Sequence, residues 1–549
     1  MGKMVSDSRV VKYLFLNFLI NVLMTFLFPS NAFSQEKDIL SDIQIVITFD
    51  SIPSVYHVEK APLMYNKDFA FSLEEDDSNK DIYTHAFKLL NGGEAEGVTY
   101  PGLSCTDGCG NLLRFRMSSS TSSFSWFDST DVHDPAGPYQ STITTWPDLI
   151  EMYSFKWGIT NHGLTSDVGN YSYSIARNHS YIQRMTQQAT PGGIDMRVFV
   201  NVNGDINFTI PAFQQDYIVC YREGYLFGNP SFDVTGIWDP LEIKMGRSYI
   251  ESNQTNLSEI VDSIAAKSKN GAHHWGVVFT HSVTDGNNGY DFPTFKSHMN
   301  FIAEKYGKNG YDNMWMTTEE EVLEYLLINR QITINTQLIG NQAIISISGE
   351  LPTNFRFYQT SLLVESDTKI ESITVSNARD YSFNGVGSKN GLINLGWNGE
   401  VRVPPEQTAE TWVSKAESSQ SQEDVNIAVD YVVILPDGTT KAAFKSRLCS
   451  IQQVTLPENF CSVGIQSLNN LSVLIYPNPA SDELIVEDNR KTLIEKKIEL
   501  FDMTGRQVFS RTATEAKFKI NVKDLQSGIY LLKLETGNRI LYKEVYKTN

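Results

Sequence analysis

Three short polar segments carry the residue types of a hydrolytic metal site. Asp76 and Asp77 follow an apolar run, and His162 lies between Asn161 and Gly163. His281 follows a second apolar run. Carboxylates and imidazoles bind divalent cations such as Zn²⁺, and both serve as proton donors and acceptors in hydrolytic sites. We therefore expect these side chains to meet in one site.

Predicted strands position two of these segments. Residues 67–73 (KDFAFSL) run into the acidic segment 74–77, and residues 275–280 (WGVVFT) end at His281. Ser78-x-x-Asp81 has the form of a capping box that begins a helix reaching Leu90. In barrel-like α/β folds, chemistry collects at the carboxyl ends of the strands. The two strand ends therefore fit an active site.

Amphipathic segments complete this part of the chain. Residues 295–306 and 318–329 are predicted helices, and Thr318-x-x-Glu321 has the form of a capping box at the start of the second. Short strands that alternate with such helices are typical of an α/β domain. We place this domain at residues 35–330.

In this order, the polar segments resemble the polysaccharide deacetylase (NodB homology) family over approximately residues 65–330. The resemblance implies a distorted (β/α) barrel with a divalent cation, expected to be Zn²⁺, bound by an aspartate and two histidines. It implies that Asp76 is the catalytic base, that Asp77 and His162 are metal ligands and that His281 is the general acid. Such a cation activates water and polarises a carbonyl group. The implied reaction is hydrolysis of N- or O-linked acetyl groups on an extracellular polysaccharide.

The metal-ligand pattern departs from the family at one position. The second histidine, expected four residues after His162, is replaced by Ser166, and Asp167 follows it. A carboxylate is an acceptable zinc ligand, so we expect Asp167 to be the third ligand. The alternatives are a ligand from elsewhere, such as His133, or a site that binds metal weakly.

Other family motifs also differ. Glu74 and Glu75 stand where a Thr-Phe or apolar pair is usual, and Ser78 stands in place of a glycine. The motif whose arginine supports the base is matched best, and only poorly, by residues 197–205, which begin with Arg197. A backbone N–H near Asn203 would there stabilise the oxyanion.

A non-catalytic glycan-binding or adhesive protein is the alternative function. Such a protein would have kept the barrel and lost a metal ligand. Exposed aromatic rings stack on sugars under either hypothesis, although most tryptophans belong to cores. The candidates for stacking are Trp126, Phe127, Trp157, Tyr171 and Trp238.

Residues 1–34 have the layout of a secretory signal peptide. Lys3, Arg9 and Lys12 precede a largely apolar run over residues 13–28, and Ala32-Phe33-Ser34 supplies small residues at a cleavage site. The apolar run is shorter than the ~20 residues that a membrane span requires. A cleaved signal is therefore preferred over an uncleaved membrane anchor.

After residue 331 the helical period gives way to strand patterns. Residues 343–348, 361–364, 373–375 and 431–435 are predicted strands, and residues 416–424 are predicted to be an exposed loop. This spacing is typical of an Ig-like β-sandwich, which we place at residues 331–466.

Residues 467–549 form another series of short predicted strands. They contain YPNPA at 476–480, FDMTGR at 501–506 and SGIYLLKL at 527–534. This combination resembles the C-terminal sorting domain of type IX secretion, also called the Por sorting domain. The resemblance implies export through the periplasm and outer membrane, with the type IX secretion machinery as a partner. The complete prediction is an α/β distorted (β/α) barrel, NodB-like, followed by two all-β sandwich domains.

Composition and cysteines limit the alternatives. The 549-residue chain has a formal net charge of −19, which argues against nucleic acid as a partner because phosphate binding needs a basic face. The spacing would allow Cys105–Cys109 and Cys449–Cys461 to close small loops in an oxidising compartment, which leaves Cys220 free. A zinc knuckle at Cys105 and Cys109 is the weaker alternative.

Overall fold

The structure is a computed structural model of the 549-residue chain. The described residues are 39–125, 127, 130–164, 170–187, 192–215, 217–220, 231–236, 245–251, 256–351, 355–398, 405–461, 473–488, 496–503, 505–536 and 539–548. The predicted signal peptide lies outside them. Within these ranges, no helix combines the length and apolar character that crossing a membrane requires. The chain divides into two units, the first comprising residues 1–412 and 426–435 and the second residues 413–425 and 436–549.

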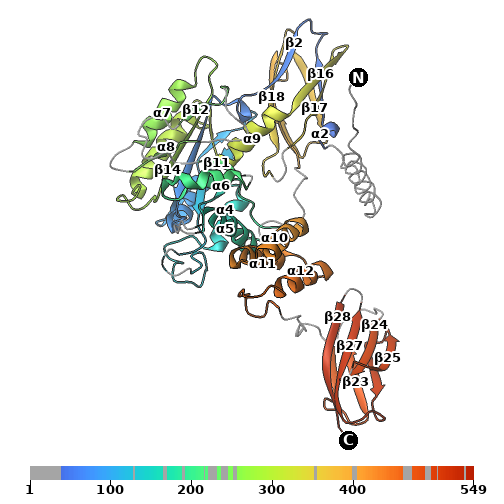
Figure 1. The fold of residues 1–549 in the computed structure, drawn as a ribbon. Coiled ribbons are helices and arrows are strands. Elements are labelled where there is room, and N and C mark those ends of the chain that lie inside the picture. Colours follow the sequence, from blue (N-terminus) through green and yellow to red (C-terminus); the bar gives the residue numbers. More distant parts are fainter. Residues whose placement is uncertain are drawn as a thin grey trace, which may run out of the picture. The chain divides into compact units, whose positions relative to one another are not determined.

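A curled, mainly parallel sheet forms the centre of the first unit (Figure 1). Its strand order is β11-β10-β9-β8-β3-β14-β12, with β13 paired to β14 and β15 paired to β3. All pairs are parallel except β12 with β14. The strands are β3 (Phe69–Asp76), β8 (Ser118–Thr121), β9 (Gly158–Asn161), β10 (Val198–Val200), β11 (Ile218–Cys220), β12 (Ser231–Asp233), β13 (Ser248–Tyr249), β14 (His274–Thr280) and β15 (Met314–Met316). The sheet is a half-barrel, so the predicted α/β class is confirmed.

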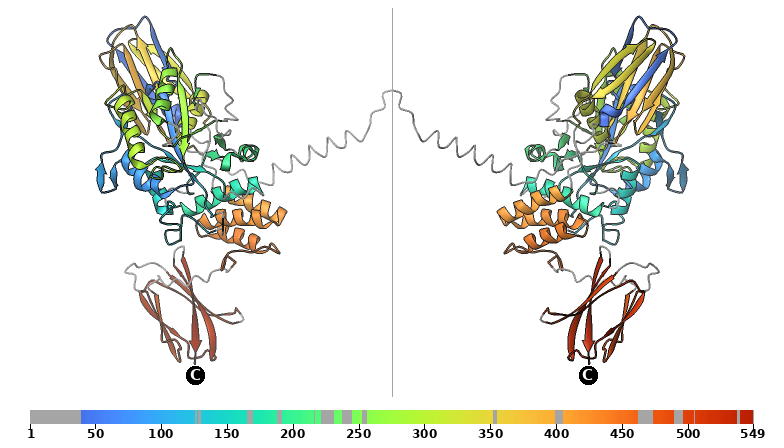
Figure 2. Two further views of the ribbon diagram at one scale, coloured as in Figure 1. Left: turned by 90° about the vertical axis from the view of Figure 1, so that its left-hand side faces the viewer. Right: turned by 90° about the vertical axis from the view of Figure 1, so that its right-hand side faces the viewer.

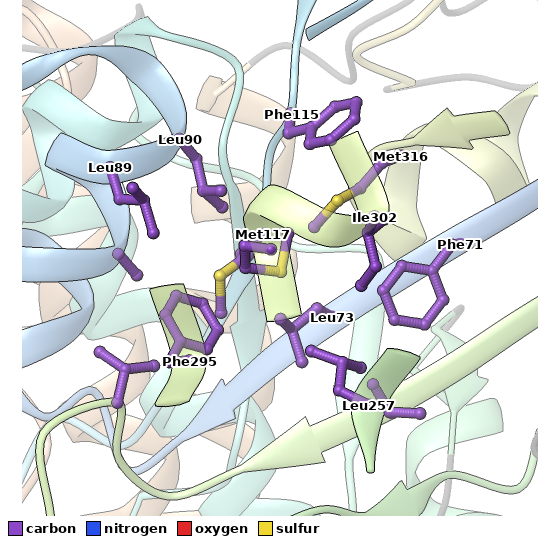
Figure 3. Packing of buried hydrophobic residues seen from close by; sticks show 14 of the residues in the cluster. Phe71, Leu73, Leu89, Leu90, Phe115, Met117, Leu257, Phe295, Ile302 and Met316 are labelled. Carbon is purple, nitrogen blue, oxygen red and sulfur yellow. The ribbon is translucent and has the colours of Figure 1, made fainter. Parts of the chain in front are cut away.

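Helices pack against this sheet. They are η2 (Ile82–Phe87), α3 (Lys88–Asn91), α4 (Trp146–Ser154), α5 (Tyr171–Met185), α6 (Thr209–Phe213), α7 (Leu257–Lys267), α8 (Phe292–Tyr306) and α9 (Glu319–Gln331). Thr318 caps α9 by accepting a hydrogen bond from the N–H of Glu321, which is one half of the predicted capping box, whereas the Glu321 carboxylate contacts Arg116. Phe71 and Leu73 of β3 pack with Phe295 and Ile302 of α8 (Figure 3). This packing holds β3 and β14 rigidly beneath their carboxyl ends.

The β-sandwich of the first unit includes strands from both ends of the α/β domain (Figure 2). One sheet has the order β16-β17-β1-β19 and the other β2-β18-β21-β20. The strands are β1 (Gln44–Phe49), β2 (Tyr56–Lys60), β16 (Thr333–Ile339), β17 (Gln342–Ser348), β18 (Gln359–Ser366), β19 (Ile370–Ser376), β20 (Asp380–Phe383) and β21 (Asn390–Gly396). The boundary predicted at residue 331 is therefore wrong for the sandwich. Alternating Ile45, Ile47 and Phe49 fill its core, which is why β1 belongs here.

Helices, rather than strands, occupy residues 405–449. These helices are α10 (Pro405–Ser419), α11 (Gln422–Ile434) and α12 (Thr439–Cys449), so the predicted strand at 431–435 and the loop at 416–424 are wrong. Buried Asp430 of α11 receives a hydrogen bond from Ser180 at 2.8 Å and ion-pairs with Arg177 and with Arg184, which lies at 3.2 Å. These contacts with α5 stabilise a helix in a β-branched segment.

The carboxyl-terminal domain consists of two antiparallel sheets. Their orders are β22-β23-β26 and β25-β24-β27-β28. The strands are β22 (Val473–Tyr476), β23 (Glu483–Asp488), β24 (Lys496–Asp502), β25 (Gln507–Ala513), β26 (Lys517–Asn521), β27 (Gly528–Thr536) and β28 (Arg539–Lys547). Leu484, Ile498 and Leu532 are buried in its core. The predicted second β-sandwich is present.

The structure bears out only part of the prediction about the cysteines. Cys449 and Cys461 form a disulfide. Cys105 is buried and Cys109 half-buried, and both are free thiols. The side chain of Cys220 lies outside the described part of the structure.

Candidate functional site

The candidate site lies at the carboxyl ends of β3, β9 and β14. Asp76 is the last residue of β3, His162 directly follows β9, and His281 directly follows β14. Because these strands run parallel, with β14 paired to β3 and β8 between β3 and β9, their carboxyl ends meet at one edge. The sheet therefore brings together the residues selected from the sequence.

Arg247, which directly precedes β13, binds the predicted base. Its Nη1 and Nη2 donate to the two oxygens of Asp76 at 2.9 and 3.2 Å, and its guanidinium lies 4.3 Å from the ring centroid of Phe279. Arg247 is 3% exposed and Asp76 2%. Burial raises the pKa of Asp76, but nearby positive charge, chiefly that of Arg247, and the hydrogen bonds from Arg247 outweigh burial and lower it. Asp76 is therefore held ionised.

A second buried carboxyl group shares Arg247. Glu74 accepts from Arg247 Nη1 and from Thr160 Oγ1, the latter at 2.6 Å. Burial raises the pKa of Glu74, and the charge of Arg247 offsets this only in part. Of the two carboxyl groups, Asp76 holds the negative charge more strongly because it binds the guanidinium through both oxygens.

A strained turn presents Asp77. The φ angles of Asp77 and Ser78 are +72° and +54°, in the left-handed region that favours glycine. Ser78 Oγ lies 2.8 Å from Thr121 Oγ1 and 3.2 Å from the carbonyl oxygen of Ser120. These contacts hold a serine where the family pattern has glycine, and the Asp77 side chain that follows β3 is 44% exposed, in contrast to the buried Asp76.

Asp77 and His162 form a pair of possible metal donors. Asp77 Oδ1 lies 3.8 Å from His162 Nε2, which is too far for a hydrogen bond but suits two donors around one cation. His162 Nδ1 lies 3.1 Å from the carbonyl oxygen of Val200. Donation from Nδ1 to this carbonyl leaves the Nε2 lone pair available to a metal. The donor chemistry therefore fits Zn²⁺ at these two residues.

The predicted third ligand lies outside the described residues, since Asp167 falls in the gap between 164 and 170. Within the described ranges, no group of three or more His, Cys, Asp and Glu residues could hold a metal ion. The alternative ligand His133 is wrong. Its Nδ1 lies 2.5 Å from the carbonyl oxygen of Thr144 and its Nε2 3.1 Å from that of Ser122, so backbone oxygens occupy both nitrogens.

His281 lies against aromatic rings at the end of β14. The centroid of its ring lies 5.3 Å from that of Tyr249 and 5.8 Å from that of Phe279. Its charge also contributes to the lowered pKa of Asp76, which places both groups in one electrostatic environment. The predicted acid and base therefore belong to the same site.

The prediction about the supporting arginine is corrected. Arg197 pairs with Asp195 at 2.7 Å, whereas Arg247 binds Asp76. No recognisable motif surrounds Arg247 in the sequence, and only the pairing of β13 with β14 brings it to the site. Asn203 has a φ of +52° in a short 3-10 turn, and the oxyanion role expected of a backbone N–H near it stays a prediction.

Among the predicted sugar-stacking rings that the structure describes, only that of Phe127 is strongly exposed. Phe127 is 93% exposed, whereas Trp157 is fully buried in the core. Tyr171 is half-buried and donates to Asp205 at 2.9 Å. Trp126 and Trp238 lie outside the described residues.

Comparison with known proteins identifies the carboxyl-terminal domain. Residues 474–547 match the secretion system C-terminal sorting domain. This domain, which serves type IX secretion, shows that the protein is exported through the outer membrane and is secreted or held at the cell surface. No curated protein matches the chain.

Three similar solved structures each cover less than half of this chain. A DUF3244 family protein of Bacteroides vulgatus with an immunoglobulin-like β-sandwich is 15% identical, over 14% of this chain and 86% of that protein, with a TM-score of 0.13. PorZ of the type IX secretion system of Porphyromonas gingivalis is 17% identical over 16% of this chain and 13% of its own, with a TM-score of 0.13. Latent PorU from the same organism is 11% identical over 40% of this chain and 15% of its own, also with a TM-score of 0.13.

Proposed function

We propose that the α/β domain is a secreted, metal-dependent carbohydrate deacetylase of the NodB type. One observation carries this proposal: Asp76, ionised by Arg247, stands beside the donor pair Asp77 and His162, with His281 at the same sheet edge. A base, two metal donors and an acid in one place are the parts that hydrolysis of an acetyl group needs.

In this proposal, Asp77 and His162 hold the cation together with a further ligand. The cation, when bound, polarises the acetyl carbonyl and lowers the pKa of water. Asp76 accepts the proton of the attacking water, whose oxygen forms a bond to the acetyl carbon. The bond from that carbon to the sugar nitrogen or oxygen breaks, and His281 gives a proton to this leaving atom. Acetate and a free amine or hydroxyl group result.

Export supports a substrate outside the cell. The sorting domain takes the chain through the outer membrane, where polysaccharides are available as substrates. The net charge of −19 disfavours polyanionic ligands such as nucleic acid. We therefore propose an acetylated polysaccharide or oligosaccharide as the substrate.

The test is the metal content of the purified mature protein, paired with acetate release from acetylated chitooligosaccharide and from acetylated xylan. We expect near-stoichiometric zinc or a similar divalent ion, and acetate from at least one substrate. Asp76→Asn should keep the metal and lose turnover, whereas Asp77→Ala should lose the metal. Asp285→Asn is the control, because Asp285 is exposed and its side chain bonds within its own turn. Wild-type turnover by Asp76→Asn would refute the assigned base, and absence of both metal and acetate would favour a glycan-binding protein.

A further inference from the structure

One carboxylate oxygen holds the turn that follows His281. Asp81 Oδ2 accepts hydrogen bonds from Ser282 Oγ at 2.5 Å and from the N–H of Val283 at 2.8 Å. It also accepts from the N–H and Oγ1 of Thr284 at 2.9 and 2.8 Å. Asp81 is 7% exposed, so these charge-assisted bonds are shielded from water. Four donors on one oxygen fix the turn relative to residue 81.

A second contact reaches His281 itself. Asn79 Nδ2 donates to the backbone carbonyl oxygen of His281 at 2.6 Å. The N–H of Asn79 donates to Glu75 Oε1 at 2.9 Å, which ties Asn79 to the end of β3. The segment that begins with Asp77 therefore hydrogen-bonds to the backbone of His281 and of the residues that follow it.

The imidazole of His281 has little polar support of its own. Its Nδ1 is buried and makes no hydrogen bond with any described residue. Its contacts are the rings of Tyr249 and Phe279. Because tilted and edge-on ring contacts fix direction less strictly than a hydrogen bond to Nδ1, the placement of this side chain depends on its backbone.

We propose that Asp81 and Asn79 are positioning residues that couple the general acid to the metal-binding segment. Asp81 acts through the turn at 282–284 and Asn79 through the carbonyl of His281. This inference rests on the proposed function, since it assigns His281 the donation of a proton to the leaving atom. Asp77 and His281 then keep a constant separation although they follow different strands.

The variants follow from the unequal use of the Asp81 oxygens. Oδ1 makes no hydrogen bond with a described residue, whereas Oδ2 accepts all four. Asp81→Asn can place its carbonyl oxygen where Oδ2 lies and keep the turn, but Asp81→Ala cannot. Asp285→Asn is again the matched control, because it makes the same chemical change in the loop that Asp81 contacts, and the Asp285 side chain bonds to Asn287 instead.

The experiment compares two substrates that differ in their need for an acid. Acetylated chitooligosaccharide has a leaving nitrogen that must be protonated, whereas 4-nitrophenyl acetate has a leaving group that needs no proton. Asp81→Ala should lower kcat on the oligosaccharide about 100-fold with KM and zinc content unchanged. Its turnover of the aryl ester should stay within about twofold of wild type, and Asp81→Asn should recover most of the loss. In a His281→Ala background, Asp81→Ala should cause no further loss.

Two results would overturn the positioning role: an equal loss on both substrates, or a further loss in the His281→Ala background. Hydrogen exchange of the Val283 and Thr284 amides separates this role from the proposed function. Faster exchange of these amides in Asp81→Ala is expected whether or not the protein is active. Unchanged exchange would overturn the claim that Asp81 holds the turn at 282–284 in place. A wild-type protein without deacetylase activity would overturn the proposed function and the catalytic part of this inference together.

Discussion

Replacing Arg247 by methionine tests the electrostatic centre of the site. The side chain is fully buried and binds both Asp76 and Glu74. Methionine approximates the aliphatic part of the arginine side chain, so the change removes the guanidinium, its charge and its contact with the Phe279 ring. Two buried carboxyl groups then lose their cation.

The magnitude follows from how the two carboxyl groups respond. Burial already raises the pKa of Glu74, so this group can take up a proton at moderate cost. Asp76 is the group that depends on Arg247 for its charge. We therefore count one broken buried ion pair, which costs about 3–5 kcal/mol of unfolding free energy. For a domain of this size, the melting transition should fall by roughly 6–20 °C.

Stability and turnover are measured on the same samples. Calorimetry of the full chain gives the α/β transition, and acetate release gives kcat. Arg247→Met should lose about 10²–10⁴-fold in kcat, the contribution typical of a general base. Arg247→Lys should be intermediate, because an ammonium group cannot bind Asp76 through two parallel bonds.

Arg116→Met is the matched control. Arg116 binds Glu321 at 2.7 Å, and the side chains are 7% and 2% exposed, so this pair is comparably buried. Since Arg116 binds Glu321 and not Asp76, Arg116→Met should lower stability without lowering the kcat of the folded protein. The reasoning would be refuted if Arg247→Met were as stable as the wild type, or if Arg247→Met and Arg116→Met lost kcat equally.

Three other predictions concern stability. Asp430→Ala should cost about 3–5 kcal/mol because it leaves two arginines of α5 without their buried partner, and an unchanged denaturation midpoint would contradict this. Burial and a neighbouring glutamate raise the pKa of Glu324 well above its ordinary value of 4.5, so its contribution to stability is lost as pH rises above 4.5. Unfolding curves should therefore show Glu324→Gln gaining relative to wild type from pH 4.5 to 8, and a pH-independent difference would count against the shift. Joint replacement of Cys449 and Cys461 by serine should lower unfolding free energy by about 3 kcal/mol, and wild type under reducing conditions should match it.

Local patterns predicted the elements that they encode directly. Residues 295–306 and 318–329 are helices within a few residues of their predicted bounds, because an apolar stripe and a capping threonine are local signals. The strand predicted at residues 67–73 extends to Asp76. The prediction ended this strand before the acidic segment, but Glu74 belongs to the strand and is buried beside Arg247.

Other elements depended on distant partners. The segment 431–435 is rich in β-branched residues and resembles a strand, but residues 431–434 form the end of α11. In this helix the buried residues Val425, Ala428 and Val432 recur at helical spacing. The ion pairs of Asp430 with α5 are contacts that no short window of sequence contains. Strand β1 likewise joins a sandwich whose other strands in that sheet come after residue 332.

The sequence by itself determined the export domain and the residue types of the site. Its short strands and turns encode the sorting domain locally, and Asp76, His162 and His281 each follow a strand. Only the tertiary structure decided which cation compensates Asp76, because Arg247 lies 171 residues away and meets it through strand pairing. Strand periodicity specifies which side chains point inward, but the register between distant strands follows from packing of the whole sheet.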